Sequence, residues 1–301
     1  MNSIKYKLFK TLLYAGGIIG FGLSSPITHS QTISFHITTP INRQGELGIS
    51  EYHWVKNTFS ILSQQNVPKQ GKLILTLQLD SARKLSLGNS KVFVEFEKDV
   101  FLTLDTNMMI SEVKSKYPGN YTLYPKLELR HEEQKLASLK SITEKKDYSK
   151  KILEERLKII ERAFEENTIS KAFYNYIKTD YEYAYLSQLF RYYTDHKDSL
   201  SLPESFLAEF TPDRFTDDKN LNSMFYAFAL DDYTTYISNV KYAYTLEVYN
   251  NRSSAIEKNF KGRQKEFLHA YLFRNFSKRQ KPEYANALKE TYPKLIELVK
   301  T

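Results

Sequence analysis

The chain has 301 residues, of which 41% are hydrophobic and 26% are charged, and it contains no cysteine. This composition suits a folded globular protein of two modest domains and excludes a disordered or fibrous chain. The absence of cysteine excludes a disulfide scaffold, a thiolate metal site, a cysteine nucleophile and a redox-active dithiol. The 43 Lys and Arg residues against 35 Asp and Glu residues give a net charge of +8.

Residues 1–30 have the layout of a secretory signal peptide. The first ten residues carry three lysines, residues 11–23 are apolar and uncharged, and the small residues Thr28 and Ser30 precede Gln31. The apolar run is shorter than the roughly 20 residues that a bilayer-spanning helix needs. We therefore expect cleavage before Gln31, a periplasmic or secreted mature protein, and no membrane span after cleavage.

Removal of this segment changes the charge argument. It lowers the number of Lys and Arg residues from 43 to 40 against 35 Asp and Glu, and the net charge from +8 to +5. A surplus of this size is ordinary for a soluble protein unless it is concentrated on one face. The densest basic clusters, at 145–151 and 278–281, lie beside acidic residues or at expected helix ends. We expect no nucleic-acid partner.

Residues 31–130 are predicted to form an antiparallel β sandwich-like domain. Apolar and polar residues alternate over 32–38 and most clearly over 73–79, which is the pattern of a half-buried strand. Two further strands are expected at 92–96 and 100–104, joined as a hairpin by a polar turn at 97–99. Turn signals at 42–45, 68–71 and 88–90 have roughly the spacing of an antiparallel sandwich, and a parallel sheet is disfavoured.

Residues 131–301 are predicted to form a helical bundle-like domain of five to seven helices. Glycine almost disappears, with Gly262 alone in this range, and the apolar residues recur at helical spacing. Thr168 is expected to cap one helix, and residues 132–151 are expected to connect the two domains. The capped helix carries an apolar residue every four positions, and this stripe drifts by about 40° at each step because one turn holds 3.6 residues. It should therefore bury a wide face against neighbours on more than one side; the stripe consists of Phe173, Ile177, Tyr181, Tyr185 and Leu189.

No residue pattern in the chain specifies a reaction. The Gly-x-Ser-x-Gly nucleophile elbow, the phosphate-binding P-loop and the dinucleotide-binding glycine pattern are all absent. His131-Glu132-Glu133 begins like the helix of a zinc protease but lacks the second histidine. We expect no catalytic residue, no metal site and no cofactor.

Two acidic segments are interpreted as structural. Residues 218–222 alternate like the ligands of a calcium loop, but the turn glycine and the bidentate glutamate of such a loop are missing. We expect Asp217 or Asp218 to cap a helix instead. Asp231 and Asp232 are expected to start a helix or to lie on its solvent-exposed face.

Tyrosine is the strongest compositional oddity, with 23 residues. Tyr181, Tyr185, Tyr192 and Tyr193 crowd one helical stretch and are the candidate binding residues, since tyrosine combines a large apolar area with a polar tip. The alternative is that they pack at helix borders.

The predicted hairpin at 90–104 and the Tyr-rich segment at 185–236 together resemble the N-terminal part of TlpA-like thiol-disulfide oxidoreductases from Gram-negative envelopes. In that family a thioredoxin domain with a Trp-Cys-x-x-Cys motif follows the helical segment. The present chain has no cysteine, and its only tryptophan, Trp54, lies in the β region. The resemblance therefore implies no redox activity, and no catalytic residue is carried over from it. It implies a stand-alone accessory or binding module that works beside a separately encoded thioredoxin-like protein, or else the remnant of a shortened gene.

Together these observations predict an exported, non-enzymatic α+β protein that engages a protein or peptide partner in the cell envelope. The alternative is a carbohydrate-binding protein or hydrolase whose site is assembled from loops. A deep pocket with converging carboxylates would favour the alternative, whereas a shallow aromatic groove would favour interaction with a protein or peptide.

Overall fold

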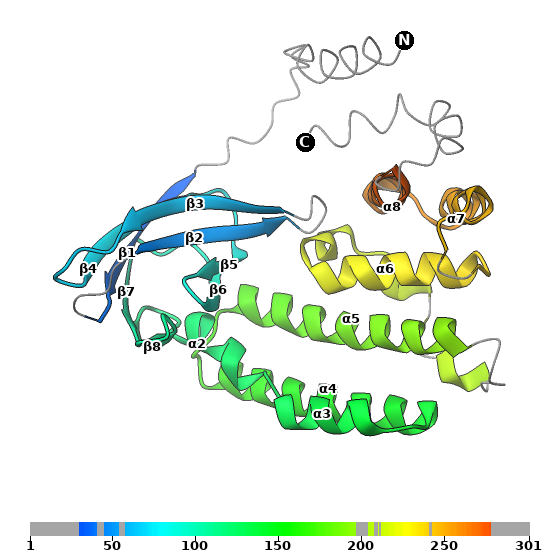
Figure 1. The fold of residues 1–301 in the computed structure, drawn as a ribbon, viewed down its shortest axis with the longest axis horizontal. Coiled ribbons are helices and arrows are strands. Elements are labelled where there is room, and N and C mark those ends of the chain that lie inside the picture. Colours follow the sequence, from blue (N-terminus) through cyan, green and yellow to red (C-terminus); the bar gives the residue numbers. More distant parts are fainter. Residues whose placement is uncertain are drawn as a thin grey trace, which may run out of the picture.

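The computed structural model describes residues 30–40, 45–53, 58–196, 204–207, 210, 212–240 and 243–277. Most of the expected signal segment, three residues of the expected turn at 42–45, Trp54 and residues 278–301 lie outside this part of the chain. The described residues form strands in the N-terminal half and helices in the C-terminal half, as the α+β class requires (Figure 1).

The strands form two four-stranded sheets. Their bounds are β1 (Gln31–Thr38), β2 (Glu46–His53), β3 (Thr58–Asn66), β4 (Lys72–Leu79), β5 (Arg83–Leu87), β6 (Ser90–Val94), β7 (Asp99–Leu104) and β8 (Ile110–Lys114). Sheet A has the order β4-β1-β7-β8 and sheet B the order β3-β2-β5-β6. Neighbouring strands are antiparallel except β1 and β7, which pair in parallel, so the expected antiparallel sandwich contains one parallel pair.

The inner faces of the two sheets enclose one apolar core. Alternation along β1 and β4 turns Ile33, Phe35, Leu75 and Leu77 inward, as the sequence predicts. The expected turns at 68–71 and 88–90 are also present. Gly71 has a φ of +67°, and a Cβ atom there would lie 2.4 Å from a backbone oxygen, so this turn requires glycine.

The expected hairpin at 90–104 is wrong, because β6 and β7 belong to different sheets. Strand β6 is buried on both faces: Val92 and Val94 contact the sandwich core, whereas Phe93 packs against the helices. Because β6 packs between the sandwich core and the helices, it lies at the edge of sheet B. The chain then crosses to sheet A, where β7 lies. The strand also ends at Val94, before the expected residue Phe96, which is 45% exposed.

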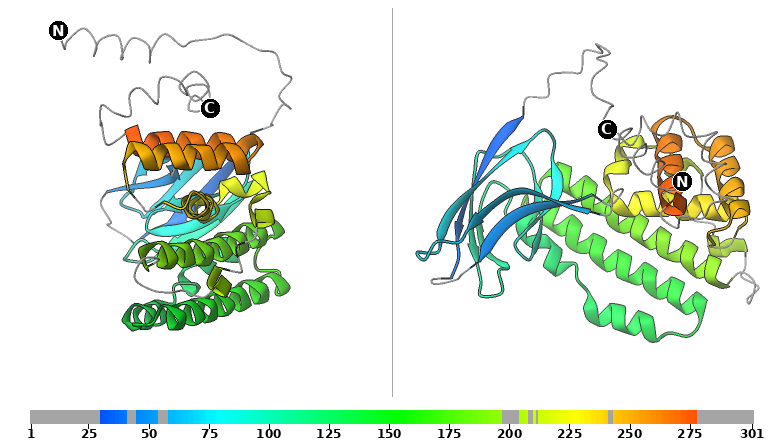
Figure 2. Two further views of the ribbon diagram at one scale, coloured as in Figure 1. Left: turned by 90° about the vertical axis from the view of Figure 1, so that its right-hand side faces the viewer. Right: turned by 45° about the horizontal axis from the view of Figure 1, so that its top comes forward.

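The helices are α2 (Gly119–Lys126), α3 (Arg130–Ser138), α4 (Ile142–Glu165), α5 (Lys171–His196), α6 (Met224–Ile237), α7 (Leu246–Asn259) and α8 (Gly262–Ser277). Three short 3₁₀ helices are η1 (Glu204–Leu207), η2 (Pro212–Phe215) and η3 (Asp218–Asn222). Helix α2 falls in the range that was expected to hold strands, and α3 with the start of α4 occupies most of the expected connector 132–151. Figure 2 shows the helices stacked in chain order, from α3 and α4 through α5 and α6 to α7 and α8.

Helix α5 begins after Ser170, and the expected cap at Thr168 is wrong. The Ser170 hydroxyl oxygen accepts a hydrogen bond from the Phe173 N–H at 3.1 Å. The Thr168 hydroxyl instead donates to the carbonyl oxygen of Ala163 at 2.9 Å, at the end of α4. A side chain that accepts from the third N–H of the helix is the usual N-cap arrangement, so the cap is Ser170.

The expected wide face of α5 is confirmed. Phe173 and Ile177 pack with α4 and with Phe93 of β6, whereas Tyr185 and Leu189 belong to a second core shared with α6, α7 and α8. Helix α5 thus joins the β-sandwich at one end to the later helices at the other. No helix within the described ranges is long and apolar enough to cross a bilayer.

Candidate functional site

The first two tyrosines proposed as binding residues make packing contacts. Tyr181 is half-buried, and the guanidinium of Arg156 lies 4.8 Å from the centre of its ring. Burial raises the pKa of the Tyr181 hydroxyl to about 12. Tyr185 is 6% exposed and lies inside the helical core.

The other two are half-buried at the far end of α5. The side-chain amide of Gln188 donates to the Tyr192 hydroxyl at 2.7 Å. The rings of Tyr193 and Tyr236 meet edge to face at 5.3 Å. None of the four lines the cleft described next, and a binding role for them stays a prediction.

A cleft of about 1700 Å³ lies between sheet B and the helices α5, α6 and α8. Residues at the ends of β2 and β3, together with residues of β5 and β6, form its sheet side. Residues of α5, of the junction of η3 with α6, and of α8 form its helical side. Small-molecule pockets usually enclose roughly 300 to 1,000 Å³. The cleft is therefore larger than a small ligand requires.

Aromatic side chains line both sides of the cleft. The rings of Tyr52 and Phe59 contact each other at 4.9 Å, and Phe59 is 66% exposed. Phe93 stacks on Phe173 at 4.9 Å, with Tyr176 at 5.2 Å. The aromatic residues of the lining are Tyr52, Phe59 and Phe93 from the sheet and Tyr176, Phe225, Phe267 and Phe273 from the helices.

One face of α8 supplies much of the helical side. Arg263, Phe267, Ala270 and Arg274 recur at steps of four, three and four, so they share a face of the helix. Two signals in the sequence were available: this helical spacing along α8, and the alternation of the apolar residues Phe59 and Ile61 with polar residues along β3. Neither signal indicates that β3 and α8 lie on opposite sides of one cleft.

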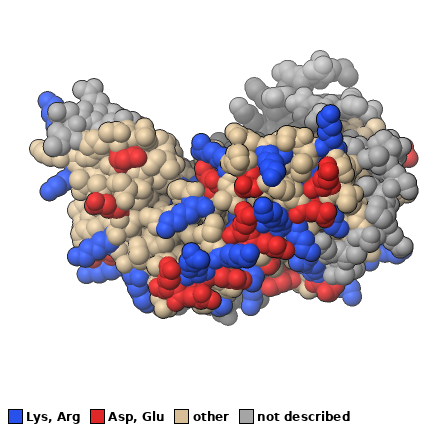
Figure 3. All heavy atoms as spheres, turned by 90° about the horizontal axis from the view of Figure 1, so that it is seen from below, with Lys and Arg blue, Asp and Glu red and all other residues tan. Residues whose placement is uncertain are grey.

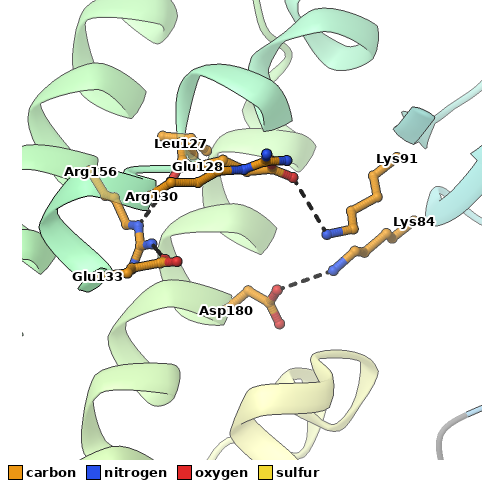
Figure 4. A network of polar contacts seen from close by, with 8 residues as sticks. All are labelled: Lys84, Lys91, Leu127, Glu128, Arg130, Glu133, Arg156 and Asp180. Carbon is orange, nitrogen blue, oxygen red and sulfur yellow. Dashed lines mark hydrogen bonds and ion pairs between the residues drawn. The ribbon is translucent and has the colours of Figure 1, made fainter. Parts of the chain in front are cut away.

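The charged residues of the cleft are largely paired. Arg83 contacts Glu51 at 3.4 Å across strands β5 and β2. Lys84 and Lys91 hold acidic partners on the helical side, as Figure 4 shows. The lining also holds further charged residues of both signs, namely Lys178, Lys219, Arg263 and Arg274 with Glu182, Asp217 and Glu266.

A polar network fixes sheet B to the helices beneath the cleft (Figure 4). The Lys84 ammonium lies 3.5 Å from the carboxylate of Asp180, which is 3% exposed and also accepts a hydrogen bond of 2.8 Å from Ser223. Lys91 lies 4.0 Å from Glu128. Since Ser223 caps α6, Asp180 ties β5, α5 and α6 together. The walls of the cleft are therefore held in a defined geometry.

Further along, Arg156 of α4 extends the same network to α3. Its Nε–H donates to the carbonyl oxygen of Leu127 at 3.0 Å, and its guanidinium pairs with Glu133. These contacts attach the loop after α2 to the α3–α4 pair.

A second polar cluster lies inside the helical core, and the expectation that Asp231 and Asp232 start a helix or face solvent is wrong. Asp231 and Asp232 lie in the middle of α6 and are 9% and 4% exposed, not on a solvent-exposed face. Arg252 of α7, itself 5% exposed, forms an ion pair with Asp231. The Ser187 hydroxyl of α5 donates to Asp232 at 2.5 Å, and the Arg191 guanidinium lies 3.8 Å away.

Burial dominates the electrostatics of this cluster. It raises the pKa of Asp232 to about 7, and it also raises the pKa of Asp231, although Arg252 opposes the latter. A raised pKa marks candidate functional groups, but structural ion-pair networks produce it as well. These two carboxylates are not part of the cleft lining, so we assign them to the architecture of the helical core.

The expected capping role of Asp217 is confirmed: its carboxylate accepts from the N–H of Lys219 at 2.9 Å, at the start of η3. Across the ranges that the structure describes, no group of three or more His, Asp or Glu side chains is placed to hold a metal ion. The face seen in Figure 3 carries positive and negative side chains interspersed over the helices and few charges over the sandwich.

Comparison of the chain with protein-family models, with curated proteins and with solved structures finds no match. The function of the cleft is therefore argued from its own geometry.

Proposed function

We propose that this protein is an exported binding module that holds a polypeptide segment of another envelope protein in the cleft between sheet B and helices α5, α6 and α8. The observation that carries the proposal is an aromatic lining on both walls of a cleft whose volume, about 1700 Å³, exceeds that of the usual small-molecule pocket. Aromatic side chains are the usual anchors of protein interfaces, because they bury a large area at a low entropy cost. The module is non-catalytic in this proposal.

The polar network beneath the cleft supports the same reading. Asp180, Lys84 and Ser223 hold the sheet and helical walls together, so the binding surface is already ordered before a partner arrives. Preorganisation reduces the entropy lost on association. The partner class includes the separately encoded thioredoxin-like protein that the family resemblance implies.

Phe59 provides the sharpest test of the cleft. Random peptides of about twelve residues, displayed on phage, would be selected against the mature protein beginning at Gln31. We expect Phe59→Ala to weaken the tightest of these peptides by at least about tenfold, since aromatic anchors dominate such interfaces. Isothermal titration calorimetry of the synthetic peptide measures the change.

Phe101 is the matched control, because it is 46% exposed on the outer face of sheet A, away from the cleft. Phe101→Ala should leave peptide affinity unchanged, and both variants should keep the melting temperature of the wild type. Failure of the library to yield any binder, or equal losses in the two variants, would contradict the proposal. Selective binding to an oligosaccharide array in place of peptides would support the carbohydrate alternative.

Export is tested separately. The basic start, the short apolar run and the small residues before Gln31 predict that a Gram-negative host processes the chain at this site. Edman sequencing of the protein released by osmotic shock should start at or close to Gln31. Recovery of Met1 on a membrane-bound product would contradict this part of the proposal.

A further inference from the structure

Strand β3 has an open edge. Among the described residues it pairs with β2 and stands at the end of sheet B, where Figure 1 shows the two strands reaching together toward the helices. Every second residue of an edge strand directs its N–H and C=O groups away from the sheet. Such a row of backbone donors and acceptors is matched by another extended strand.

The composition of β3 leaves this edge unprotected. Its sequence, Thr58–Asn66, contains no charged residue, no proline and no glycine. Proteins usually protect an edge with lysine, proline, a β-bulge or a covering element, and of these β3 shows an irregular register with β2 just beyond Ile61. Of the other three edge strands, β6 packs against α2, β8 carries Glu112 and Lys114, and β4 begins with Lys72 but holds no further charge.

The exposed side chains of β3 are apolar. Phe59 is 66% exposed and Ile61 is 65% exposed, and because they are two residues apart they lie on the same face of the strand. Phe59 also lines the cleft beside Tyr52. The open edge and the cleft are therefore parts of one continuous surface. The register of β3 with β2 shifts only beyond Ile61, so this segment is regular.

We propose that the partner segment is an extended strand that pairs with the open edge of β3, with its alternate side chains packed against Phe59 and Ile61. This inference rests on the proposed function and specifies how the cleft recognises its partner. Main-chain hydrogen bonds supply affinity in this mode, and the side chains on one face supply specificity. Because β3 carries no charge, the paired strand needs apolar side chains on that face and no particular charge.

Backbone methylation tests the hydrogen bonds directly. The tightest peptide from the phage selection would be synthesised in two versions, each N-methylated on alternate amides, so that one or the other edge of the extended peptide is blocked. We expect one version to lose binding at least about tenfold and the other to bind like the parent, because a strand pairs with β3 through a single edge. Equal effects of the two methylation patterns would overturn the strand inference.

Ile61→Lys tests the same edge from the protein side, since a charge on an edge strand opposes pairing. Ile61 is not part of the cleft lining, and Ile74→Lys on the outer face of sheet A, at a position that is 49% exposed, is the matched control. We expect the Ile61 variant alone to lose affinity and to lose the slowing of β3 amide exchange that the peptide causes in the wild type. If Phe59→Ala weakens binding but Ile61→Lys does not, the cleft function stands and the strand inference fails.

A second copy of the chain is the competing occupant of the edge. Sedimentation velocity of the wild type should show a monomer over the concentrations used for titration. A concentration-dependent dimer that Ile61→Lys abolishes would assign the edge to self-association and would overturn the inference.

Discussion

Replacing Arg252 with Met is expected to lower the free energy of unfolding by about 3 to 5 kcal/mol, the usual cost of removing one partner from a buried ion pair. Arg252 is 5% exposed and pairs with Asp231, which is 9% exposed in the middle of α6. Methionine keeps much of the side-chain volume, so the loss reports the missing charge more than a cavity. Urea denaturation followed by far-UV circular dichroism measures it.

The loss should also depend on pH. Without Arg252, burial raises the pKa of Asp231 further, and a protonated Asp231 no longer needs a counter-charge. The Arg252 variant is therefore expected to be closer to the wild type under acidic conditions than at alkaline pH. Asp231→Asn in the same chain should restore part of the stability at alkaline pH.

Arg191 is the matched control, because it lies 3.8 Å from Asp232 but its side chain is 58% exposed. Asp232 is buried, but solvent reaches the guanidinium of Arg191 and screens its interaction with the carboxylate more than it screens the Arg252–Asp231 pair. Arg191→Met should therefore cost far less than Arg252→Met. Equal costs for the two arginines would show that Arg252 does not compensate a buried charge.

Asp232→Asn is expected to stabilise the protein at neutral and alkaline pH. The pKa of Asp232 is raised from 3.8 to about 7, mainly by burial. The native state therefore binds more protons than the unfolded chain between these two values, and its stability falls as pH rises through this window. Above about pH 7 the carboxylate is ionised in both the native and the unfolded state, so its destabilising effect is complete and no longer changes with pH. Asparagine is neutral at every pH and keeps an oxygen that accepts from Ser187.

The groups that face Asp232 set the size of this effect. Asp231 raises its pKa, Ser187, Arg191 and Arg252 lower it, and Tyr271 of α8 senses its charge. Each unit of pKa difference between the native and unfolded states is worth about 1.4 kcal/mol, so the variant should gain a few kcal/mol at alkaline pH. The measurement is the difference in unfolding free energy between wild type and variant from about pH 4 to 8. A difference that does not grow with pH would show that Asp232 is ionised in the native state throughout.

Periodicity along the chain was sufficient for the elements with the clearest pattern, but not for α2, which falls in the range that was expected to hold strands. The alternation in 32–38 and 73–79 predicted strands β1 and β4, and the stripe from Phe173 to Leu189 predicted α5 with its wide buried face. The capping role of Asp217 was also accessible, because a cap depends on N–H groups two or three residues away. Such features depend on neighbours in sequence, and the sequence alone therefore determined them, together with the absence of any thiol chemistry.

Tertiary structure decided which elements meet, because these contacts join residues far apart in sequence. Strand β6 joins sheet B because Phe93 packs against Phe173 and Tyr176 on α5. No local pattern in the sequence distinguishes this arrangement from a hairpin between β6 and β7. Asp231 is buried because Arg252, 21 residues further along the chain, supplies the opposite charge. In the same way, the cleft exists only where β3 and α8 are brought to opposite walls. Two adjacent acidic residues predict solvent exposure. They are buried only where a residue of opposite charge, distant in sequence, pairs with them.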